Sequence, residues 1–222
     1  MQCLAFIVDG NRRWAKARGL STYEGHKKGS EVLSDSIDWV KEAGIPHVVY
    51  YVFSTENWNR SKEEVDYLMQ LLEEWLDKLA KHLVEREARV RFVGQRSDLS
   101  ESLRQKIDRI ENESLPYGDK TTVWFAFSYG GRAEIVAAVN EAIAKGEAVT
   151  EESFAQYLWT AELPDPDLIV RTSGEERLSN FLTWRSVYSE LYFIEKNWPA
   201  LTKSDFDGIL NEYESRERRH GR

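Results

Sequence analysis

Short, continuous apolar runs that alternate with long helical patterns constrain the fold of this chain more than any other feature of its sequence. Six such runs are predicted to be β-strands, over residues 3–8, 47–54, 89–94, 121–128, 167–171 and 190–193. They are apolar at successive positions rather than at every second position, as is typical of parallel strands that are covered on both faces. The segments between them have helical patterns over about 22–44, 62–87, 99–113, 131–145, 151–160 and 203–218.

This alternation predicts an α/β fold with a mostly parallel, six-stranded sheet surrounded by helices. The clearest helical stripe has apolar residues at Val65, Leu68, Leu72, Trp75, Leu79 and Leu83. At 222 residues the chain can bury a full core, and no internal repeat, low-complexity tract or long linker divides it. We therefore expect a single domain over residues 1–222.

Composition and charge exclude several classes of protein. The formal net charge of −8 argues against nucleic-acid binding as the main role, so any bound anion must be held by a local cluster of basic groups. Cys3 is the only cysteine, which excludes an internal disulfide framework and a cysteine-built zinc site. The sequence has no apolar run of about eighteen residues and no signal-peptide pattern, so we expect a soluble, cytoplasmic protein.

Polar segments follow several of the predicted strands. In open parallel sheets, ligands bind beyond the carboxyl ends of the strands. The segments "DGNRRW", "STENWNR", "SYGGR" and "RTSGEERLSN" each follow a predicted strand, and each contains arginine. We therefore expect them to converge at one edge of the sheet and to form an anion-binding site there.

The first of these segments, "VDGNRRWA", combines an acid with two arginines. Asp9 directly follows a strand, and with Gly10 beside it the carboxylate can ligate Mg²⁺. Asn11 can cap the next helix, whose free N–H groups favour anions, and Arg12 and Arg13 can neutralise phosphate oxygens. The alternative interpretation is structural, with Asp9 as a helix cap that is paired to an arginine.

The segment "FSTENWNRSKEEV" lies between a strand and a long helix, where a loop can close over a ligand. Ser61 and Glu64 also have the spacing of a capping box for that helix, so part of this sequence has a purely structural explanation. Asn57, Trp58 and Arg60 are not needed for capping, which makes them candidates for binding.

Two further groups of residues suggest anion binding. Arg171, Arg177 and Ser179 lie on one short polar segment and can together grip a diphosphate, while Glu190 supplies a second acid at a strand start. His26 in "GLSTYEGHKKG" can donate to a phosphate from the start of a helix, or can be a cap or core residue. The spacing of this segment is not that of a phosphate-binding P-loop, and neither a dinucleotide fingerprint nor the acid pair of a phosphatase is present.

Taken together and in order, "VDGNRRWA", "GHKKG", "FSTENWNR", "SYGGRAEIV", "LPDPDLIVRTSGEERLSNF", "YSELYF" and "RERRHG" resemble the cis-prenyltransferase family over almost the whole chain. The resemblance implies a parallel sheet wrapped by helices with a hydrophobic tunnel, a homodimer, and dependence on Mg²⁺. It also implies condensation of isopentenyl diphosphate with an allylic primer, farnesyl or geranyl diphosphate. The product would be a Z-polyprenyl diphosphate, undecaprenyl or shorter, and transient membrane contact for its release is possible.

The resemblance also implies roles for individual residues. Asp9 would hold Mg²⁺ on a diphosphate, Glu190 would complete the metal site, and Asn57 would lie near the proton that leaves. The allylic diphosphate would be cradled by Gly10, Asn11, Arg12, Arg13, Trp14 and His26. A mobile segment would carry Ser54, Thr55, Glu56, Asn57, Trp58 and Arg60. Isopentenyl diphosphate would be bound by Arg171, Arg177, Leu178 and Ser179. Arg219 and Gly221 match an Arg-x-Gly element that reaches the partner subunit's site.

Some positions depart from the family's pattern. Arg12 stands where a glycine is usual, and an arginine common in the family is replaced at Thr22. Arg12 is therefore a candidate to compensate for the missing contact to the primer's diphosphate. Glu176 stands where a neutral residue or histidine is commoner, and it places an acid near a diphosphate.

The strand "TTVWFAFS" is bulkier than is usual in this family. Thr121, Val123, Phe125 and Phe127 are expected on one face of it, with Trp124 and Ala126 on the other. If the phenylalanines line the tunnel, they and Val52 shorten it, and the product is shorter than undecaprenyl; otherwise they pack the core.

An alternative function is that of a non-catalytic partner subunit in a heteromeric prenyltransferase. Such subunits usually lack the aspartate and the loop motif. Asp9 and "STENWNR" are both present here, so an active enzyme is the favoured interpretation.

Overall fold

One parallel β-sheet forms the centre of the computed structural model, which describes residues 1–118 and 120–216. Its strands are β1 (Cys3–Ile7), β2 (His47–Ser54), β3 (Arg89–Val93), β4 (Thr122–Tyr129), β5 (Leu168–Thr172) and β6 (Glu190–Ile194). In the described residues they form a six-stranded sheet in the order β3-β4-β2-β1-β5-β6, and every neighbouring pair is parallel. The predicted strands and the α/β class are confirmed.

The helices also follow the predicted pattern, with two differences. They are α1 (Asn11–Lys16), α2 (Thr22–Glu42), α3 (Lys62–Arg86), α4 (Glu101–Glu113), α5 (Gly131–Lys145), α6 (Glu151–Phe154) and α7 (Lys203–Ser215). The helix predicted over 151–160 is shorter, because the chain passes into a 3₁₀ turn that buries Phe154 and Leu158 beside α5. Among the described residues, no helix has the length and apolarity needed to cross a membrane.

Helix α1 is not among the helices predicted from periodicity, and its start corrects the expected role of Asn11 as a helix cap. Gly10 precedes the helix with φ 102°, a left-handed conformation that favours glycine and turns the chain directly from strand to helix. Asn11 is the first helical residue rather than the N-cap, and its side-chain Nδ2 donates to the carbonyl of Val8 at 3.2 Å. The first turn of α1 therefore has no side-chain cap.

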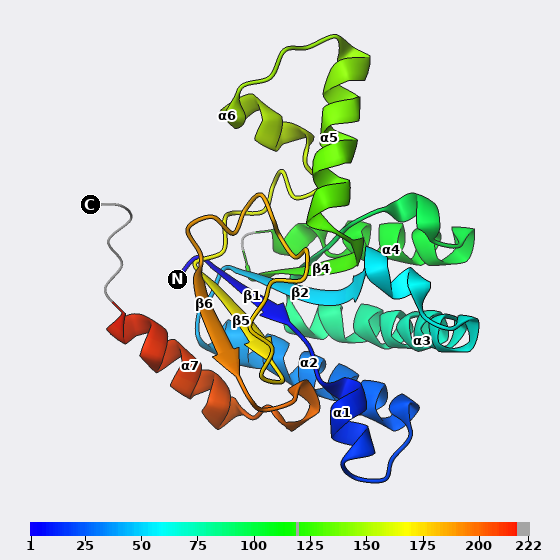
Figure 1. Cartoon of the computed structure of the whole chain (residues 1–222), viewed down its shortest axis with the longest axis vertical. Coiled ribbons are helices and arrows are strands. Elements are labelled where there is room, and N and C mark those ends of the chain that lie inside the picture. Colours follow the sequence, from blue (N-terminus) through cyan, green and yellow to red (C-terminus); the bar gives the residue numbers. More distant parts are fainter. Residues whose placement is uncertain (119, 217–222) are drawn as a thin grey trace.

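Two different layers cover the sheet, one made of helices and the other largely of irregular chain (Figure 1). On one face, α2, α3, α4 and α7 pack against Phe6, Tyr50 and Phe125, all of which are fully buried. Burial of each such aromatic side chain contributes roughly 1.5–3 kcal/mol. The other face is covered largely by irregular chain, including Leu163, Phe181 and Leu182, while α5 and α6 project away from the body (Figure 1).

Strand β4 shows the predicted alternation of side chains. Val123, Phe125 and Phe127 belong to the core beneath the helices, and Trp124 and Ala126 face the other layer. The alternation stops at Ser128, whose φ of 47° reverses the direction of the next side chain. This turn places polar groups at the carboxyl end of the strand.

The glycines of "GHKKG" allow α1 to lie very close to α2. A Cβ atom on Gly25 would lie 2.3 Å from the backbone oxygen of Asn11, and one on Gly29 would lie 2.0 Å from its side-chain Oδ1. Neither contact is sterically possible, so the close approach of the two helices requires both glycines. Their role is helix packing, consistent with the absence of a P-loop.

Candidate active site

A polar cleft of about 540 Å³ lies at the carboxyl edge of the sheet, beyond the ends of β1, β2 and β5. Most of the predicted site residues line it, including those from segments far apart in the sequence. They are Asp9, Gly10, Asn11, Arg12, His26, Ser54, Glu56, Asn57, Arg60, Arg171 and Ser179. The structure thus brings three of the four polar strand-end segments together in the cleft, whereas no residue of "SYGGR" is among those that line it.

Other predicted residues do not line this cleft. Arg13, Trp14, Thr55, Trp58, Arg177 and Leu178 lie outside its lining, and the ring of Trp14 lies under the Arg18 guanidinium at 4.5 Å. Arg219 and Gly221 lie outside the described residues.

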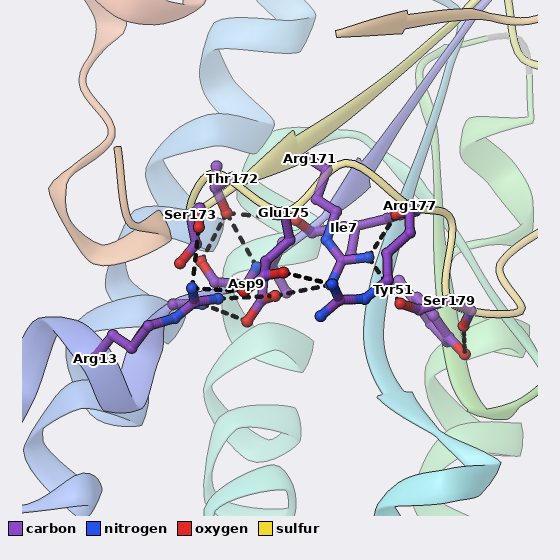
Figure 2. Close-up of polar contacts among 12 residues, drawn as sticks. Ile7, Asp9, Arg13, Tyr51, Arg171, Thr172, Ser173, Glu175, Arg177 and Ser179 are labelled. Atoms are coloured by element: carbon purple, nitrogen blue, oxygen red, sulfur yellow. Dashed lines mark hydrogen bonds and ion pairs between the residues drawn. The ribbon is translucent and has the colours of Figure 1, made fainter. Parts of the chain in front are cut away.

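Asp9 and Arg171 form the central ion pair of the cleft (Figure 2). Arg171 is only 4% exposed; its Nη2 donates to Asp9 Oδ2 at 2.9 Å, and its Nη1 donates to Ser179 Oγ at 2.7 Å. The N–H of Gly10 donates to the second Asp9 oxygen at 2.7 Å. Burial opposes ionisation of Asp9, but the Arg171 hydrogen bond and charge, with the Gly10 N–H and the Arg13 charge, hold its pKa below the usual value.

The backbone of Asp9 is fixed by the neighbouring strand. Thr172 Oγ1 donates to the Asp9 carbonyl at 2.7 Å and accepts from the Asp9 N–H at 3.0 Å. The parallel register that pairs Ile7 with Arg171 makes these contacts possible. Thr172 had no signal in the sequence, because nothing there shows that β5 lies beside β1.

A second ion-pair cluster lies at the rim, where Glu175 bridges two arginines (Figure 2). Arg13 Nη1 lies 2.8 Å from Glu175 Oε1, and Arg177 Nη1 lies 2.5 Å from Oε2. The Arg177 hydrogen bond and charge, followed by those of Arg13, lower the pKa of Glu175. The sequence drew attention to Glu176, but it is Glu175 that pairs with the arginines.

The segment after β2 forms a short 3₁₀ helix, Thr55–Asn59, above the cleft. The Asn57 Oδ1 accepts from the Ser54 N–H at 3.2 Å, which fixes the carboxamide of Asn57 at the cleft wall. The Trp58 indole donates to Ser128 Oγ at 2.8 Å and packs on Phe53 at 5.0 Å. Trp58 therefore anchors the segment to the sheet.

Glu64 joins α3 to two arginines of the cleft. Arg60 Nη1 donates to Glu64 Oε1 at 2.9 Å, and Arg12 Nη1 lies 3.6 Å from Oε2. The Glu64 N–H donates to Ser61 Oγ at 3.3 Å, so half of the predicted capping box is present. The reciprocal half is missing because the Glu64 carboxylate turns toward the arginines.

His26 lies in the first part of α2 with its ring in the cleft. Its buried Nε2 makes no hydrogen bond within the described chain. Burial, with the positive charges of Arg60 and Arg12, lowers the pKa of His26 to about 4 despite the opposing charge of Glu64. The imidazole is therefore neutral near pH 7, and an Nε2–H can donate to an anion.

This low pKa predicts a specific acid sensitivity of the fold. The ordinary histidine pKa of 6.5 applies to the unfolded chain, so between pH 6.5 and about pH 4 the unfolded state binds a proton that the folded state does not. The free energy of unfolding should therefore fall on acidification, by about 2 kcal/mol between pH 7 and pH 5. Denaturant titrations of His26→Gln should show a pH dependence smaller by that amount; parallel curves for the two proteins would contradict the assignment.

An apolar cavity of about 100 Å³ adjoins the cleft and shares Val8, Asn11 and His26 with it. Val52 and Phe127 line this cavity. That they shorten a tunnel stays a prediction. Phe125 does not line it, because its ring packs against Trp75 at 4.8 Å within the core.

The residues of the cleft fit a magnesium ion bound jointly with a substrate. Mg²⁺ is commonly held by one or two carboxylates together with substrate phosphates. Asp9 offers an ionised carboxylate at the cleft wall, which fits that role. Glu190 is not brought to Asp9, because it begins β6 and pairs with Leu168 at the opposite edge of the sheet. Within the described chain, no three His, Cys, Asp or Glu side chains form a metal-binding group.

Comparisons with known proteins agree with this geometry. The family model described as "Putative undecaprenyl diphosphate synthase" matches residues 7–221. An isoprenyl transferase of Thermotoga maritima is 47% identical over 99% of this chain and 96% of its own length. A tritrans,polycis-undecaprenyl-diphosphate synthase (geranylgeranyl-diphosphate specific) of Picrophilus torridus is 43% identical over 98% of this chain and 89% of its own length.

A solved structure has the same fold. It is that of lavandulyl diphosphate synthase from Lavandula x intermedia in complex with dimethylallyl diphosphate. The TM-score is 0.94 at 34% sequence identity, and the match covers 100% of this chain and 98% of the other. The chain therefore belongs to the undecaprenyl diphosphate synthase family of cis-prenyltransferases.

Proposed function

We propose that this protein condenses isopentenyl diphosphate with an allylic diphosphate primer, geranyl or farnesyl diphosphate, and releases diphosphate as it forms a Z-polyprenyl diphosphate. Its family makes it a transferase of cis-prenyl chain elongation. The observation that carries the finer proposal is the placement of Asp9 among arginines in a cleft that adjoins an apolar cavity.

Ionisation of the primer is the step that this cleft is suited to promote. Negative charge develops on the departing diphosphate, and fixed guanidinium groups stabilise it without the reorganisation that water requires. Arg12 and Arg60 line the cleft, and both contact the Glu64 carboxylate. A departing diphosphate would take the place of Glu64 as their partner. Asp9 would hold Mg²⁺, which supplies further stabilisation of the departing diphosphate.

Two diphosphate positions are supported by the arrangement of side chains around Asp9. We place the primer on Gly10, Asn11, Arg12, Arg13, Trp14 and His26, because Asn11 and His26 also line the apolar cavity that would receive the primer's hydrocarbon chain. We place isopentenyl diphosphate on Arg171, Arg177, Leu178 and Ser179, since Arg171 already binds the Ser179 hydroxyl.

Carbon–carbon bond formation then follows between the two positions. The isopentenyl double bond attacks C1 of the ionised primer, and loss of a proton forms the new cis double bond. Asn57 is assigned near that proton because its carboxamide is fixed at the cleft wall by the Ser54 N–H. Burial of each added five-carbon unit offers several kcal/mol, at about 0.8 kcal/mol per CH₂, which keeps the growing chain bound.

Product length tests both the function and the tunnel hypothesis. Phe127 and Val52 line the cavity, and we propose that they limit its length. Purified protein with Mg²⁺, labelled isopentenyl diphosphate and either primer is then expected to give products shorter than C55. Chromatographic sizing of the dephosphorylated products measures this. Products of full C55 length would refute the constriction, and the absence of Mg²⁺-dependent incorporation with either primer would refute the proposed function.

A homodimer is proposed on the basis of an apolar face of α5 that the described part of the chain leaves exposed. Val136, Val139 and Ile143 are 59%, 41% and 70% exposed and repeat at helical spacing on the helix that projects from the body (Figure 1). A second copy of the chain is the partner that the family suggests. Cytoplasmic location and transient membrane contact remain predictions from the sequence.

The alternative of a non-catalytic partner subunit is disfavoured by the intact cleft. Asp9 is ionised and held in place, and the segment carrying Asn57 is ordered against the sheet. A subunit without activity would need neither arrangement.

A further inference from the structure

Asn180 was not singled out in the sequence, yet it lines the cleft in an unusual conformation. Its φ is 66°, and those of the nearby Ser179 and Leu182 are 49° and 43°. Asparagine tolerates the left-handed region better than most residues because its short polar side chain can bond locally. Three such residues within one short stretch must be held by specific contacts.

The carboxamide of Asn180 bonds to two elements at once. Its Nδ2 donates to Glu56 Oε1 at 2.8 Å, and its Oδ1 accepts from the Arg132 N–H, in the first turn of α5, at 2.9 Å. A carboxylate only accepts and an N–H only donates, so these two partners fix the orientation of the amide. The Asn180 carbonyl also accepts from the Gly131 N–H at 2.7 Å.

The Gly-Gly pair of "SYGGR" provides the room for this junction. A Cβ on Gly130 would lie 2.5 Å from Thr55 Oγ1 and 2.8 Å from Asn180 Nδ2. A Cβ on Gly131 would lie 2.2 Å from Thr183 Oγ1. The two glycines therefore allow the 3₁₀ segment, the loop around Asn180 and the start of α5 to meet.

The same loop carries the groups proposed to bind isopentenyl diphosphate. Ser179 is the neighbour of Asn180 and accepts from Arg171 at its hydroxyl. The Tyr51 hydroxyl lies 3.3 Å from the Ser179 carbonyl and 3.2 Å from that of Tyr129, so its hydrogen bond is shared between the two carbonyls. Burial, followed by the charge of Glu56, raises the pKa of Tyr51, so this hydroxyl stays protonated and able to donate. A shift of Asn180 would be transmitted directly to Ser179.

We propose that Asn180 is a positioning residue that sets the Glu56-bearing segment at a fixed distance from the loop of Arg177 and Ser179, so that the two walls of the cleft are aligned for the second substrate. This inference rests on the proposed function. Asn180 acts through Glu56 and Ser179, and its effect should therefore depend on both partners being present.

Two substitutions of Asn180 separate its side-chain contacts from its backbone conformation. Asn180→Gly removes the carboxamide but accepts the left-handed φ, and Asn180→Asp retains the acceptor for Arg132 but places a second carboxylate against Glu56. We expect each to lower kcat/KM for isopentenyl diphosphate about tenfold, since a hydrogen bond to a charged group is lost. The KM for the allylic primer should stay unchanged, because Asn180 contacts none of its proposed ligands.

Asn112→Gly is the matched control, since it makes the same chemical change at an exposed position near the end of α4. It should lose stability without changing either KM. An Asn180→Gly variant with the KM values and kcat of Asn112→Gly would overturn the inference. If Asn180→Gly fails to fold, the Asn180→Asp variant provides the test. Wild-type kinetics of Asn180→Asp would also overturn the inference.

The double variant Glu56→Ala/Asn180→Gly tests the coupling itself. If Asn180 works through Glu56, the double variant should be no less active than the worse of the two single variants. Losses that multiply would overturn the inference while the wild-type enzyme remains active. A wild-type protein with no prenyl-transfer activity would instead refute the proposed function, and this inference with it.

Discussion

Replacing Asp9 with alanine is expected to lower kcat on the order of a thousandfold or more while the protein stays folded. The carboxylate is the proposed holder of Mg²⁺ and is also the partner of Arg171. Its loss removes stabilisation of the departing diphosphate and leaves a guanidinium without its counter-charge. Incorporation of labelled isopentenyl diphosphate under saturating Mg²⁺ measures the effect.

Asp9→Ala should lower the free energy of unfolding, because the buried Arg171 guanidinium loses its counter-charge. The fold should still form, because Thr172 holds the backbone of Asp9 and not its carboxylate. Asp207→Ala, at an exposed aspartate on α7, is the control and should keep full activity. Circular dichroism would establish that both variants are folded. Turnover by Asp9→Ala close to that of Asp207→Ala would overturn the proposed mechanism.

Substitution of Arg171 by alanine is expected to have the second largest effect, on both activity and stability. Arg171 is nearly buried and joins Asp9 to Ser179 and to the carbonyl of Arg177. Removal of one partner of a buried pair commonly costs about 3 kcal/mol of unfolding free energy, because the other charge is left uncompensated. We expect that loss, and a fall of about a thousandfold in kcat/KM for isopentenyl diphosphate.

Two further variants show which property of Arg171 matters. Arg171→Lys keeps the charge but not the planar fork that reaches Asp9 and Ser179 together, so it should recover stability only in part. Arg12→Ala removes an exposed arginine, whose side chain is 58% accessible, and should leave stability almost unchanged. Equal stability losses for Arg171→Ala and Arg12→Ala in urea titrations would contradict the central place given to Arg171.

Most of the strands were predictable from sequence because a short continuous apolar run is typical of a strand covered on both faces. Two strands differ: β3 alternates arginine with apolar residues, and β6 is only partly buried. Helix α1 was not predictable from periodicity, since six residues make less than two turns and cannot display it. The faces of β4 were predicted correctly, but whether Phe125 or Phe127 reaches the cavity depends on how α3 packs. This packing depends on Trp75 of α3, which contacts the Phe125 ring but is distant from it in the sequence.

The candidate site was predictable in its location more than in its contacts. The carboxyl ends of parallel strands lie at the same edge of a sheet. The sequence alone therefore predicted that Asp9, Arg171 and Asn57 lie at one edge. The choice of Glu175 over Glu176 depends on the left-handed backbone at Ser173 and Gly174, which sequence does not show. The separation of Glu190 from Asp9 follows from strand register, which is also a property of the folded sheet.

The arginines in the cleft and at its rim are paired with glutamates of the same chain, and this pairing affects the electrostatics of the proposed substrate binding. Glu175 lies between Arg13 and Arg177, and Glu64 accompanies Arg60 and Arg12. Under the proposed function, an incoming diphosphate would replace an internal counter-anion, so that binding would be an exchange of one anion for another. Its free energy is the difference between two pairings, so it favours ligands that carry more charge and more oxygen atoms than a carboxylate does. Such an exchange would favour diphosphates over abundant anions of single charge. It would do so without leaving the arginines unpaired before a diphosphate binds.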